Sequence, residues 1–368
     1  MGIYSKNIQQ LARNLDQLNN DSSVRSALIM IADKTQIKKS DVNPVLKQFI
    51  KPIIGGVFPE LIVDGKRMTA GILLVPLPFL IKSLLIDCSN QKDDYLEYLD
   101  EHFAGNTGKH LFVFTDVLAS QKTEIIENLY NYFGLTVTYL GGGAGSLSFQ
   151  PTDCIIDNQG IHQNACVIAL TDHPVSLDAA HGWLPISEPL KVTDAWDNQI
   201  KSINWEPAFD IYKKIVEKHS GNILEEDDFF NLAKSYPLGL IKLDDELIIR
   251  DPIKTEEKKL HIVDRINQGE YIYVMHGNME SLLKAAKKAK EGAINNGKDF
   301  KNIFMIDCIS RVLFMTDDFQ KEIDIVKHQD IPVYGALTIG EIANNGSSFL
   351  EIYNKTIAIA TWKQKSAT

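Results

Sequence analysis

The sequence predicts an α/β protein of two related halves, each with a mixed sheet flanked by helices, preceded by a short helical N-terminus. Two observations indicate this class. From residue 52 onward, short apolar runs bounded by Gly and Pro alternate with amphipathic helical runs. In addition, Leu111–Asp116 (LFVFTD) before Tyr139-Leu140-Gly141 is matched further on by Ile303–Asp307 (IFMID) before Tyr334-Gly335-Ala336. A repeat this long indicates duplicated domains rather than a solenoid.

Residues 1–40 are predicted to form an N-terminal helical segment. The apolar residues at spacings of three and four, which mark one face of a helix, are Ile8, Leu11, Leu15 and Leu18. A second helical run is expected over Ser23–Ala32. Beyond it the pattern changes to strands at Pro52–Phe58 and Gly71–Val75, with Asp64-Gly65 between them as a turn signal.

The first half is predicted to span residues 41–205. Strands are expected at Leu84–Cys88, Leu111–Asp116 and Val137–Leu140. A helix is expected at Asp93–Phe103, and a second helix begins after Ser120, a favourable cap. The strand at Val137–Leu140 runs into the glycine-rich segment Gly141–Gly145. Two further strands are expected at Asp153–Ile156 and Ala165–Leu170.

The second half is predicted to span residues 206–368, with the join at Trp205-Glu206-Pro207, because Pro207 suits the first turn of a helix. Two helices are indicated by apolar faces, one with Leu282, Ala286, Ala289 and Ala293, the other with Phe319, Ile323 and Val326. The expected strands are Tyr271–Met275, Ile303–Asp307, Pro332–Tyr334, Phe349–Ile352 and Thr356–Thr361.

Composition restricts the class of protein. The 38 Lys and Arg against 48 Asp and Glu give a net charge of −10, whereas a nucleic-acid-binding protein needs a basic surplus. The N-terminus lacks the apolar block of a signal peptide, and the longest apolar stretch, Ala70–Ile81, is too short to span a bilayer. The four cysteines are scattered without metal-site spacing. We expect a soluble, acidic, cytoplasmic protein with no nucleic-acid or membrane partner.

The glycine-rich segment Gly141-Gly142-Gly143-Ala144-Gly145 has two interpretations. Its backbone amides could bind an anion or a planar ligand, because small residues permit close approach. Alternatively, it is a tight turn where two sheets meet. It is not the dinucleotide fingerprint, since Ser146 stands where the third glycine is needed. The P-loop, GxSxG and HExxH motifs are absent from the sequence.

Three further clusters contain side chains that could bind a ligand or react. His181-Gly182-Trp183-Leu184-Pro185 places an imidazole and an indole on a stiff turn, as a ligand platform, an axial metal ligand or a core plug. Cys308-Ile309-Ser310-Arg311 follows a strand, so its thiol either lines a pocket or acts as a nucleophile with a lowered pKa. In Gly340-Glu341-Ile342 the carboxylate could bind an amine, pair with Arg311 or lie exposed in a loop.

Taken together, the motifs resemble the FIST sensory domain family. The glycine-rich segment, His181-Gly182-Trp183-x-Pro185 and Val192-Thr193 stand in the order of its N-terminal part. The motifs that resemble its C-terminal part are Pro207-Ala208, Tyr236-Pro237-Leu238-Gly239, Arg250-Asp251-Pro252, Cys308-x-x-Arg311 and Gly335-Ala336-x-x-x-Gly340-Glu341-Ile342. The similarity covers residues 45–362. One departure is Ser146, where the family often has Asp after GGGAG.

The resemblance implies a sensory protein that binds a small ligand and regulates a sensor histidine kinase or a cyclic-di-GMP enzyme. Without a kinase, GGDEF-type or transmembrane region, the sequence matches the free-standing form of the family, part of which resembles haem proteins (haem b) that sense nitric oxide. His181 is then the expected axial ligand, with His162, His173 and His276 as rivals. The predicted ligand-binding residues are Gly141, Gly142, Gly143, His181, Trp183, Cys308, Arg311, Gly340 and Glu341.

Three alternatives remain open. In the first, the ligand is a free amino acid or a related metabolite without haem, bound by Arg311, Glu341 and the amides of Gly141–Gly145. In the second, the protein is an enzyme that uses Cys308 as a nucleophile, although our prediction is that it is not an enzyme. In the third, it is an interaction scaffold with an empty cleft. A homodimer is also left open.

Overall fold

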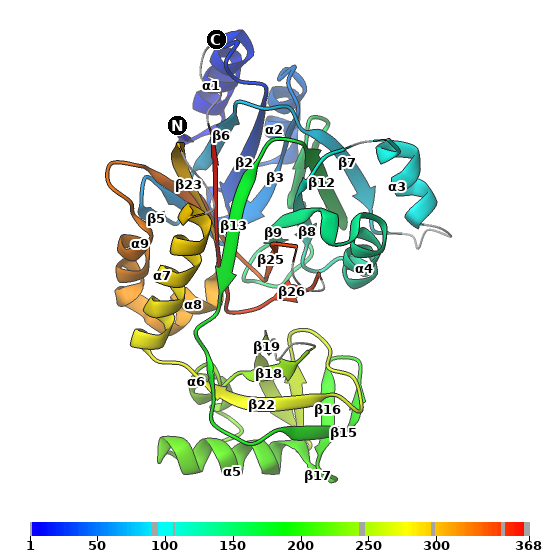
Figure 1. Ribbon diagram of the computed structural model, residues 1–368, viewed down its shortest axis with the longest axis vertical. Helices are drawn as coiled ribbons and strands as arrows, with labels where there is room; N and C mark the ends of the chain where they lie inside the picture. Colours follow the sequence, from blue (N-terminus) through cyan, green and yellow to red (C-terminus); the bar gives the residue numbers. More distant parts are fainter. Residues whose placement is uncertain are drawn as a thin grey trace.

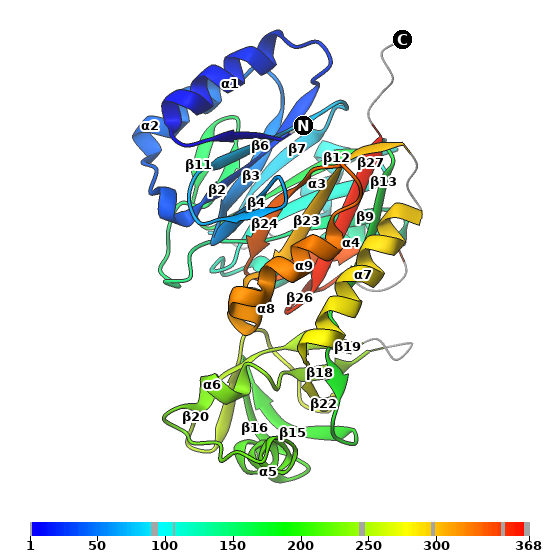
Figure 2. The same cartoon turned by 90° about the vertical axis from the view of Figure 1, so that its left-hand side faces the viewer.

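The computed structural model describes residues 2–89, 95–105, 107–242, 247–295, 299–346 and 350–363. It comprises an α/β body and a smaller sheet domain attached at one end of it (Figure 1). Helices α7, α8 and α9 run along one side of the body, as Figure 2 shows. The predicted α/β class with mixed sheets, flanking helices and a short N-terminal helix is confirmed.

The first unit of the body is formed by the N-terminal residues. Its elements are β1 (Ile3–Ser5), α1 (Ile8–Asn20), β2 (Ser26–Ala32), α2 (Lys39–Lys47), β3 (Ile53–Phe58), the hairpin β4 (Glu60–Val63) and β5 (Lys66–Met68), and β6 (Ile72–Leu77). The helix predicted over Ser23–Ala32 is wrong, because β2 occupies this segment. All seven residues of β2 are buried between neighbouring strands, and a continuously apolar run fits a central strand better than an amphipathic helix.

The second unit repeats the order of the first. Its elements are β7 (Lys82–Asp87), α3 (Tyr95–Phe103), β8 (His110–Asp116), α4 (Lys122–Phe133), β9 (Thr138–Ala144), the hairpin β10 (Ile155–Asp157) and β11 (Gly160–His162), and β12 (Ala165–Thr171). Residues 93 and 94 of the predicted helix Asp93–Phe103 lie outside the described residues; the remainder is α3. The other strands predicted here are confirmed within a few residues.

The third unit is interrupted after its first strand. Its elements are β13 (Val175–Ala180), α7 (Met279–Asn295), β23 (Phe300–Cys308), α8 (Ile309–Met315), α9 (Phe319–Val326), β24 (Val333–Thr338), the hairpin β25 (Glu341–Asn344) and β26 (Ile352–Tyr353), and β27 (Ile357–Lys363). Residue 349 of the predicted strand Phe349–Ile352 is outside the described residues. The predicted face of α7 is buried against the sheet.

The three units are arranged as a closed cycle. The four strands of each unit follow the same order in their sheet: β1-β6-β2-β3, β7-β12-β8-β9 and β13-β27-β23-β24. In each series the third strand is the central strand, and the fourth runs parallel to it. Each hairpin then leaves its own unit, so that β4 pairs with β24, β10 with β3 and β25 with β9. The repeat predicted from Tyr139 and Tyr334 is therefore present at β9 and β24, and the structure adds a third copy at β3.

A glycine at the same place in each unit shows the physical basis of the repeat. Gly55, Gly141 and Gly335 stand on the parallel strands β3, β9 and β24. A Cβ at any of them would lie 1.7 Å from the carbonyl oxygen of the facing residue on the central strand, which is Ile29, Val113 or Met305. Only glycine fits this close approach of the two backbones.

The interruption in the third unit forms the small domain. Its strands are β14 (Leu184–Pro185), β15 (Leu190–Trp196), β16 (Gln199–Ile203), β17 (Glu206–Pro207), β18 (Leu238–Ile241), β19 (Leu247–Arg250), β20 (Pro252–Glu256), β21 (Lys259–Ile262) and β22 (Tyr271–His276). They form one antiparallel sheet with the helices α5 (Ala208–Ser220) and α6 (Phe229–Ala233). Trp205, at the join predicted from sequence, lies within this domain. No helix in the ranges described is long and apolar enough to cross a membrane.

Candidate ligand-binding site

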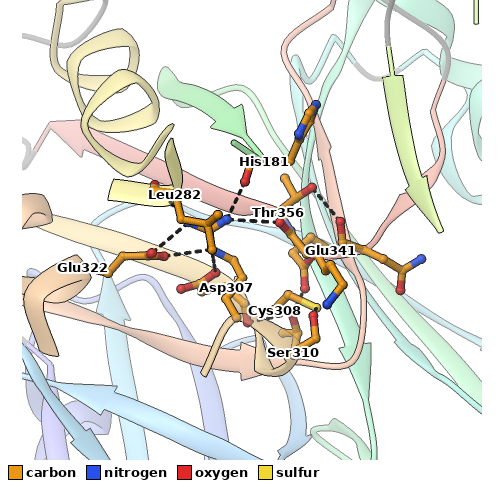
Figure 3. Close-up of polar contacts among 12 residues, drawn as sticks. His181, Leu282, Asp307, Cys308, Ser310, Glu322, Glu341 and Thr356 are labelled. Carbon is orange, nitrogen blue, oxygen red and sulfur yellow. Dashed lines mark hydrogen bonds and ion pairs between the residues drawn. The ribbon is translucent and has the colours of Figure 1, made fainter. Parts of the chain in front are cut away.

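Arg311, on α8, is the centre of a buried charged cluster, the Arg311 cluster, made with Asp307 and Glu322 (Figure 3). All three side chains are fully buried. Nε and Nη2 of Arg311 donate to the two carboxylate oxygens of Glu322 at 2.9 and 2.8 Å, and Nε lies 3.3 Å from Oδ1 of Asp307. The carbonyl oxygens that accept from its remaining N–H groups belong to His181 at 2.6 Å, and to Leu282 and Lys355 at 3.2 Å.

The guanidinium and the carboxyl groups of the Arg311 cluster compensate each other's charge. Although burial opposes it, the carboxylates of Glu322 and Asp307 raise the pKa of Arg311 above its usual value. Burial, together with the charge of Glu322, raises the pKa of Asp307 well above its usual range. Arg311 thus donates to the carboxylate of Glu322 and to three carbonyls, and makes a charge contact with Asp307, so its guanidinium is enclosed rather than facing a cavity.

Cys308 and Glu341 lie beside this cluster. Sγ of Cys308 is 2.9 Å from Oγ of Ser310, and burial raises the pKa of the thiol far above its usual value, the opposite of an activated nucleophile. Glu341 is fully buried at the start of β25 and accepts from Oγ1 of Thr338 at 2.9 Å and from the Thr356 amide at 3.1 Å. Burial raises the pKa of Glu341 to about 8.

A cavity of about 520 Å³, here the interdomain cavity, lies between the body and the small domain. Its body side is formed where the parallel strands β8, β9, β23 and β24 end, at Thr115, Gly143, Cys308 and Gly340. Carboxyl ends of parallel strands are the usual ligand-binding edge of α/β sheets. The volume suits a small organic molecule.

Six apolar side chains surround this cavity although each is 40–53% exposed, and we name them the apolar mouth. The body contributes Leu118, Leu147, Phe149 and Leu313, and the small domain contributes Phe230 and Ile253. Single exposed apolar residues are ordinary, but six around one cavity are characteristic of a binding site. Both parts of the molecule therefore contribute to the same apolar opening.

The polar groups of the interdomain cavity are mostly paired. Lys122 Nζ lies 3.1 Å from Oδ1 of Asp264, whose other oxygen accepts from Nδ2 of Asn354 at 3.0 Å. Asp251, 6% exposed, follows β19, and its Oδ1 lies 3.2 Å from Nζ of Lys355, which reaches over from the body. Burial raises the pKa of Asp251 even though the Lys355 ammonium opposes that shift.

A second cavity of about 840 Å³, the His181 cavity, is lined by His181 and Trp183. The indole of Trp183 is buried and its Nε1 donates to the Lys355 carbonyl at 3.3 Å. The Trp183 amide donates to Nδ1 of His181 at 3.0 Å, and the His181 ring points away from the Arg311 cluster (Figure 3). Burial, with the charges of Arg311 and Lys288, lowers the pKa of His181 to about 4.

An axial haem ligand needs a ring nitrogen with a free lone pair. Because Nδ1 of His181 accepts from Trp183, the neutral ring carries its proton on Nε2, so neither nitrogen offers one. His181 in this arrangement does not fit the role unless it gives up its bond to Trp183. Of the rivals, His162 is bound to Asp157, whereas His173 stacks on Phe79 and His276 on Tyr236. None of these three is among the described residues that line the two cavities.

The glycine-rich segment lies within one sheet, since Gly141 to Ala144 form the end of β9. Gly141 and Gly142 pair with β8 on one side and β25 on the other. The Gly143 amide donates to the Gly340 carbonyl at 2.8 Å, and the Gly143 carbonyl accepts from the Ile339 amide at 3.0 Å. These backbone groups are therefore used within the protein, although in a strand of one sheet rather than in the tight turn between two sheets that the second interpretation expects.

The structure divides the residues predicted for the site into three groups. Gly143, Cys308 and Gly340 line the interdomain cavity. His181 and Trp183 line the other cavity. The remaining four line neither of these two cavities and are buried or paired within a sheet: Gly141, Gly142, Arg311 and Glu341.

Sequence reasoning missed the small-domain side of the interdomain cavity. The one available signal was Arg250-Asp251-Pro252, which is one of the motifs that resemble the family. In the structure Arg250 pairs with Glu351 at 2.8 Å, and Asp251 pairs with Lys355. The apolar residues Phe230 and Ile253 gave no signal, because only the fold brings them to the opening.

The fold is an α/β body with an inserted sheet domain, and both parts line the interdomain cavity, whose size suits a small ligand. The FIST N domain matches residues 6–206 and the FIST C domain matches residues 208–344, so the chain belongs to the FIST family. FIST domains are sensory domains of signal transduction that bind small ligands. No curated protein matches the chain.

Proposed function

We propose that this FIST protein senses a small molecule bound in the interdomain cavity and transmits its presence to a sensor histidine kinase or a cyclic-di-GMP enzyme. The observation that carries the proposal is that the body and the small domain each provide part of one apolar opening. A ligand that contacts both parts favours the arrangement in which they are close. Its binding energy is then available to change the surface that a partner recognises.

The connections between the two parts support such a response. The chain passes between them at two places, from β13 to β14 and from β22 to α7. The Lys355–Asp251 ion pair links them beside the cavity. Because Asp251 also lines the cavity, a molecule bound there lies beside a contact between the two parts.

A thermal-shift screen with intracellular metabolites tests this function. A compound that binds the native state stabilises the wild type by RT ln(1 + c/Kd), where c is its free concentration, so the melting temperature rises with the logarithm of the ligand concentration once this exceeds Kd. In Leu313→Trp, which enlarges a side chain of the apolar mouth, the shift should disappear. The matched control Leu184→Trp, in the His181 cavity, should retain it. If no compound of the library raises the melting temperature of the wild type at millimolar concentration, the proposal is contradicted.

Haem-based sensing of nitric oxide is the second candidate function. The observation that favours it is the His181 cavity, which is large enough for a porphyrin and carries Lys284 and Lys288, able to pair with carboxylates. Haem b bound there would supply an iron atom as the nitric oxide receptor. To bind the iron, His181 would first have to release its Nδ1 from the hydrogen bond with the Trp183 amide. For this reason haem-based sensing ranks behind the metabolite sensor.

An absorption titration with haem, before and after nitric oxide, decides between the two. A saturable Soret band that moves with nitric oxide and is lost in His181→Ala supports the haem function. The control His173→Ala should leave the band unchanged, because this ring stacks on Phe79 outside both cavities. A broad band that never saturates indicates adventitious haem binding, and sensing of a metabolite is then the function that remains proposed.

A further inference from the structure

Two buried oxygen atoms at the interdomain cavity lack a hydrogen-bond partner. They are Oγ1 of Thr115, whose side chain is 1% exposed, and Oδ1 of Asp251. Both residues line the cavity, and within the described part of the chain neither atom has an acceptable hydrogen bond. Oδ1 of Asp251 has only its charge contact with Lys355. Leaving such groups unsatisfied is costly, so a hydrogen-bond donor that reaches them from the cavity would be favoured.

The cations near the cavity are already engaged. Lys122 is paired with Asp264, and Arg311 is enclosed by its carboxylates and carbonyls. The Lys355 ammonium donates to the Lys234 carbonyl at 2.9 Å and lies 4.8 Å from the centre of the Trp183 ring, in addition to its contact with Asp251. The described surface of this cavity therefore has no free positive group for an anionic ligand.

The charged side chains that line the cavity also favour a cationic ligand. They are two carboxylates, Asp251 and Asp264, and one lysine, Lys122. Lys122 and Asp264 compensate each other, whereas Lys355, which pairs with Asp251, is not among the described residues that line the cavity, so Asp251 is the charged group that this second pair presents to it. An ammonium group offers three donors and a positive charge, which suit a carboxylate and a hydroxyl acceptor such as those of Asp251 and Thr115 in the wall of the same cavity.

We propose that the ligand of the interdomain cavity is an organic amine, with its ammonium group on Asp251 and Thr115 and an apolar body against the apolar mouth. The inference rests on the proposed function and narrows its ligand to one chemical class. It excludes a free amino acid held by its carboxylate, because Arg311 and the glycine amides are occupied. The apolar part gains affinity by covering exposed side chains such as Phe149 and Ile253.

Calorimetric titration with three probes of the same shape tests the charge of the head group: 2-phenylethylamine, 2-phenylethanol and phenylacetate. We expect the amine to bind about tenfold or more tightly than the alcohol, a difference of about 1.4 kcal/mol. Phenylacetate should not bind. Equal affinity of alcohol and amine overturns the cationic head group, and preference for phenylacetate overturns the inference entirely.

Variants then locate the head group. Asp251→Asn should weaken the amine about tenfold and leave the alcohol unchanged, whereas the control Asp153→Asn should change neither. Because Asp251→Asn leaves Lys355 unpaired and could unfold the protein, Thr115→Val provides a second variant without a change of charge. It should weaken the amine as well. Unchanged amine binding in a folded Asp251→Asn and in Thr115→Val overturns the proposed contacts.

The outcomes distinguish this inference from the function on which it rests. If none of the three probes binds while the metabolite screen finds a compound whose effect is lost in Leu313→Trp, the amine inference fails and the sensor function stands. If the amine binds wild type and Leu313→Trp equally, the binding site is elsewhere and the inference is overturned.

Discussion

Replacing Arg311 with methionine tests whether its guanidinium holds the body together. Met has similar length and no charge, so the change removes five hydrogen bonds with little loss of volume. It leaves Glu322 and Asp307 fully buried without their cation, and leaves the carbonyls of His181, Leu282 and Lys355 with a donor missing. These carbonyls belong to three separate parts of the chain, so the damage is not local.

The expected cost is set by the burial of the two carboxyl groups. Removing one partner of a buried ion pair costs about 3–5 kcal/mol. Protonation of Asp307, whose pKa is already raised, limits the cost, whereas a carbonyl left without any donor adds to it by about 1–3 kcal/mol; the Lys355 carbonyl keeps the Trp183 indole as a donor. Since such terms do not add, we expect a loss of about 4 kcal/mol in the free energy of unfolding.

Urea denaturation followed by both circular dichroism and tryptophan fluorescence measures this loss. Fluorescence is informative because Trp183 and Arg311 donate to the same carbonyl, that of Lys355. The exposed control Arg265→Met, whose only ion pair in the described residues is a 4.0 Å contact with Glu127, should cost less than about 1 kcal/mol. Adding Glu322→Gln to Arg311→Met should restore part of the stability, because it removes an unpaired charge. A loss below about 1 kcal/mol in Arg311→Met refutes the reasoning.

Three further predictions concern single residues. Because the pKa of Glu341 is raised to about 8 in the folded state, its contribution to stability is present at low pH and decreases as pH rises from its usual pKa to about 8. Urea denaturation at acidic and at alkaline pH should therefore show that the free energy of unfolding decreases less with rising pH in Glu341→Gln than in the wild type. An equal decrease in the two proteins contradicts the raised pKa of Glu341. Gly335→Ala should cost about 3 kcal/mol because its Cβ meets the Met305 carbonyl. The control Gly105→Ala, with φ +71° and open space, should cost about 1 kcal/mol; equal costs in calorimetry argue against the steric reason. Iodoacetamide should alkylate Cys308 more slowly at neutral pH in the native than in the unfolded protein, and rapid native labelling, read by mass spectrometry, contradicts the raised pKa.

Local patterns predicted most elements, and the exceptions have a common cause. The spacing of Leu282, Ala286 and Ala289 predicted a helix face that is buried in α7. The run Ser26–Ala32 was misinterpreted because an entirely apolar segment has no period, and its neighbours on both sides, β3 and β6, decide that it is a strand. The third repeat escaped notice for the same reason: it begins in the segment assigned to helices.

The candidate site was predictable only in part. Sequence motifs located Gly143, Cys308 and Gly340, all at the ends of parallel strands, where the fold class places a ligand. They could not tell that Arg311 turns inward, because its partner Glu322 lies on a different helix, α9, and Asp307 on β23. Nor could they place Asp251 at the cavity, since Lys355, its partner, is more than a hundred residues away in the chain.

The sequence by itself determined the α/β class, the family, the alternation of strands and helices and the glycines where backbones approach closely. Each of these depends on local periodicity or on residue size. The tertiary structure alone decided that three units close into a cycle through exchanged hairpins, and that the chain between β13 and α7 forms a separate sheet. It also decided which polar groups face a cavity. The physical reason is that strand exchange and buried ion pairs join residues distant in sequence, and no local pattern encodes those partners.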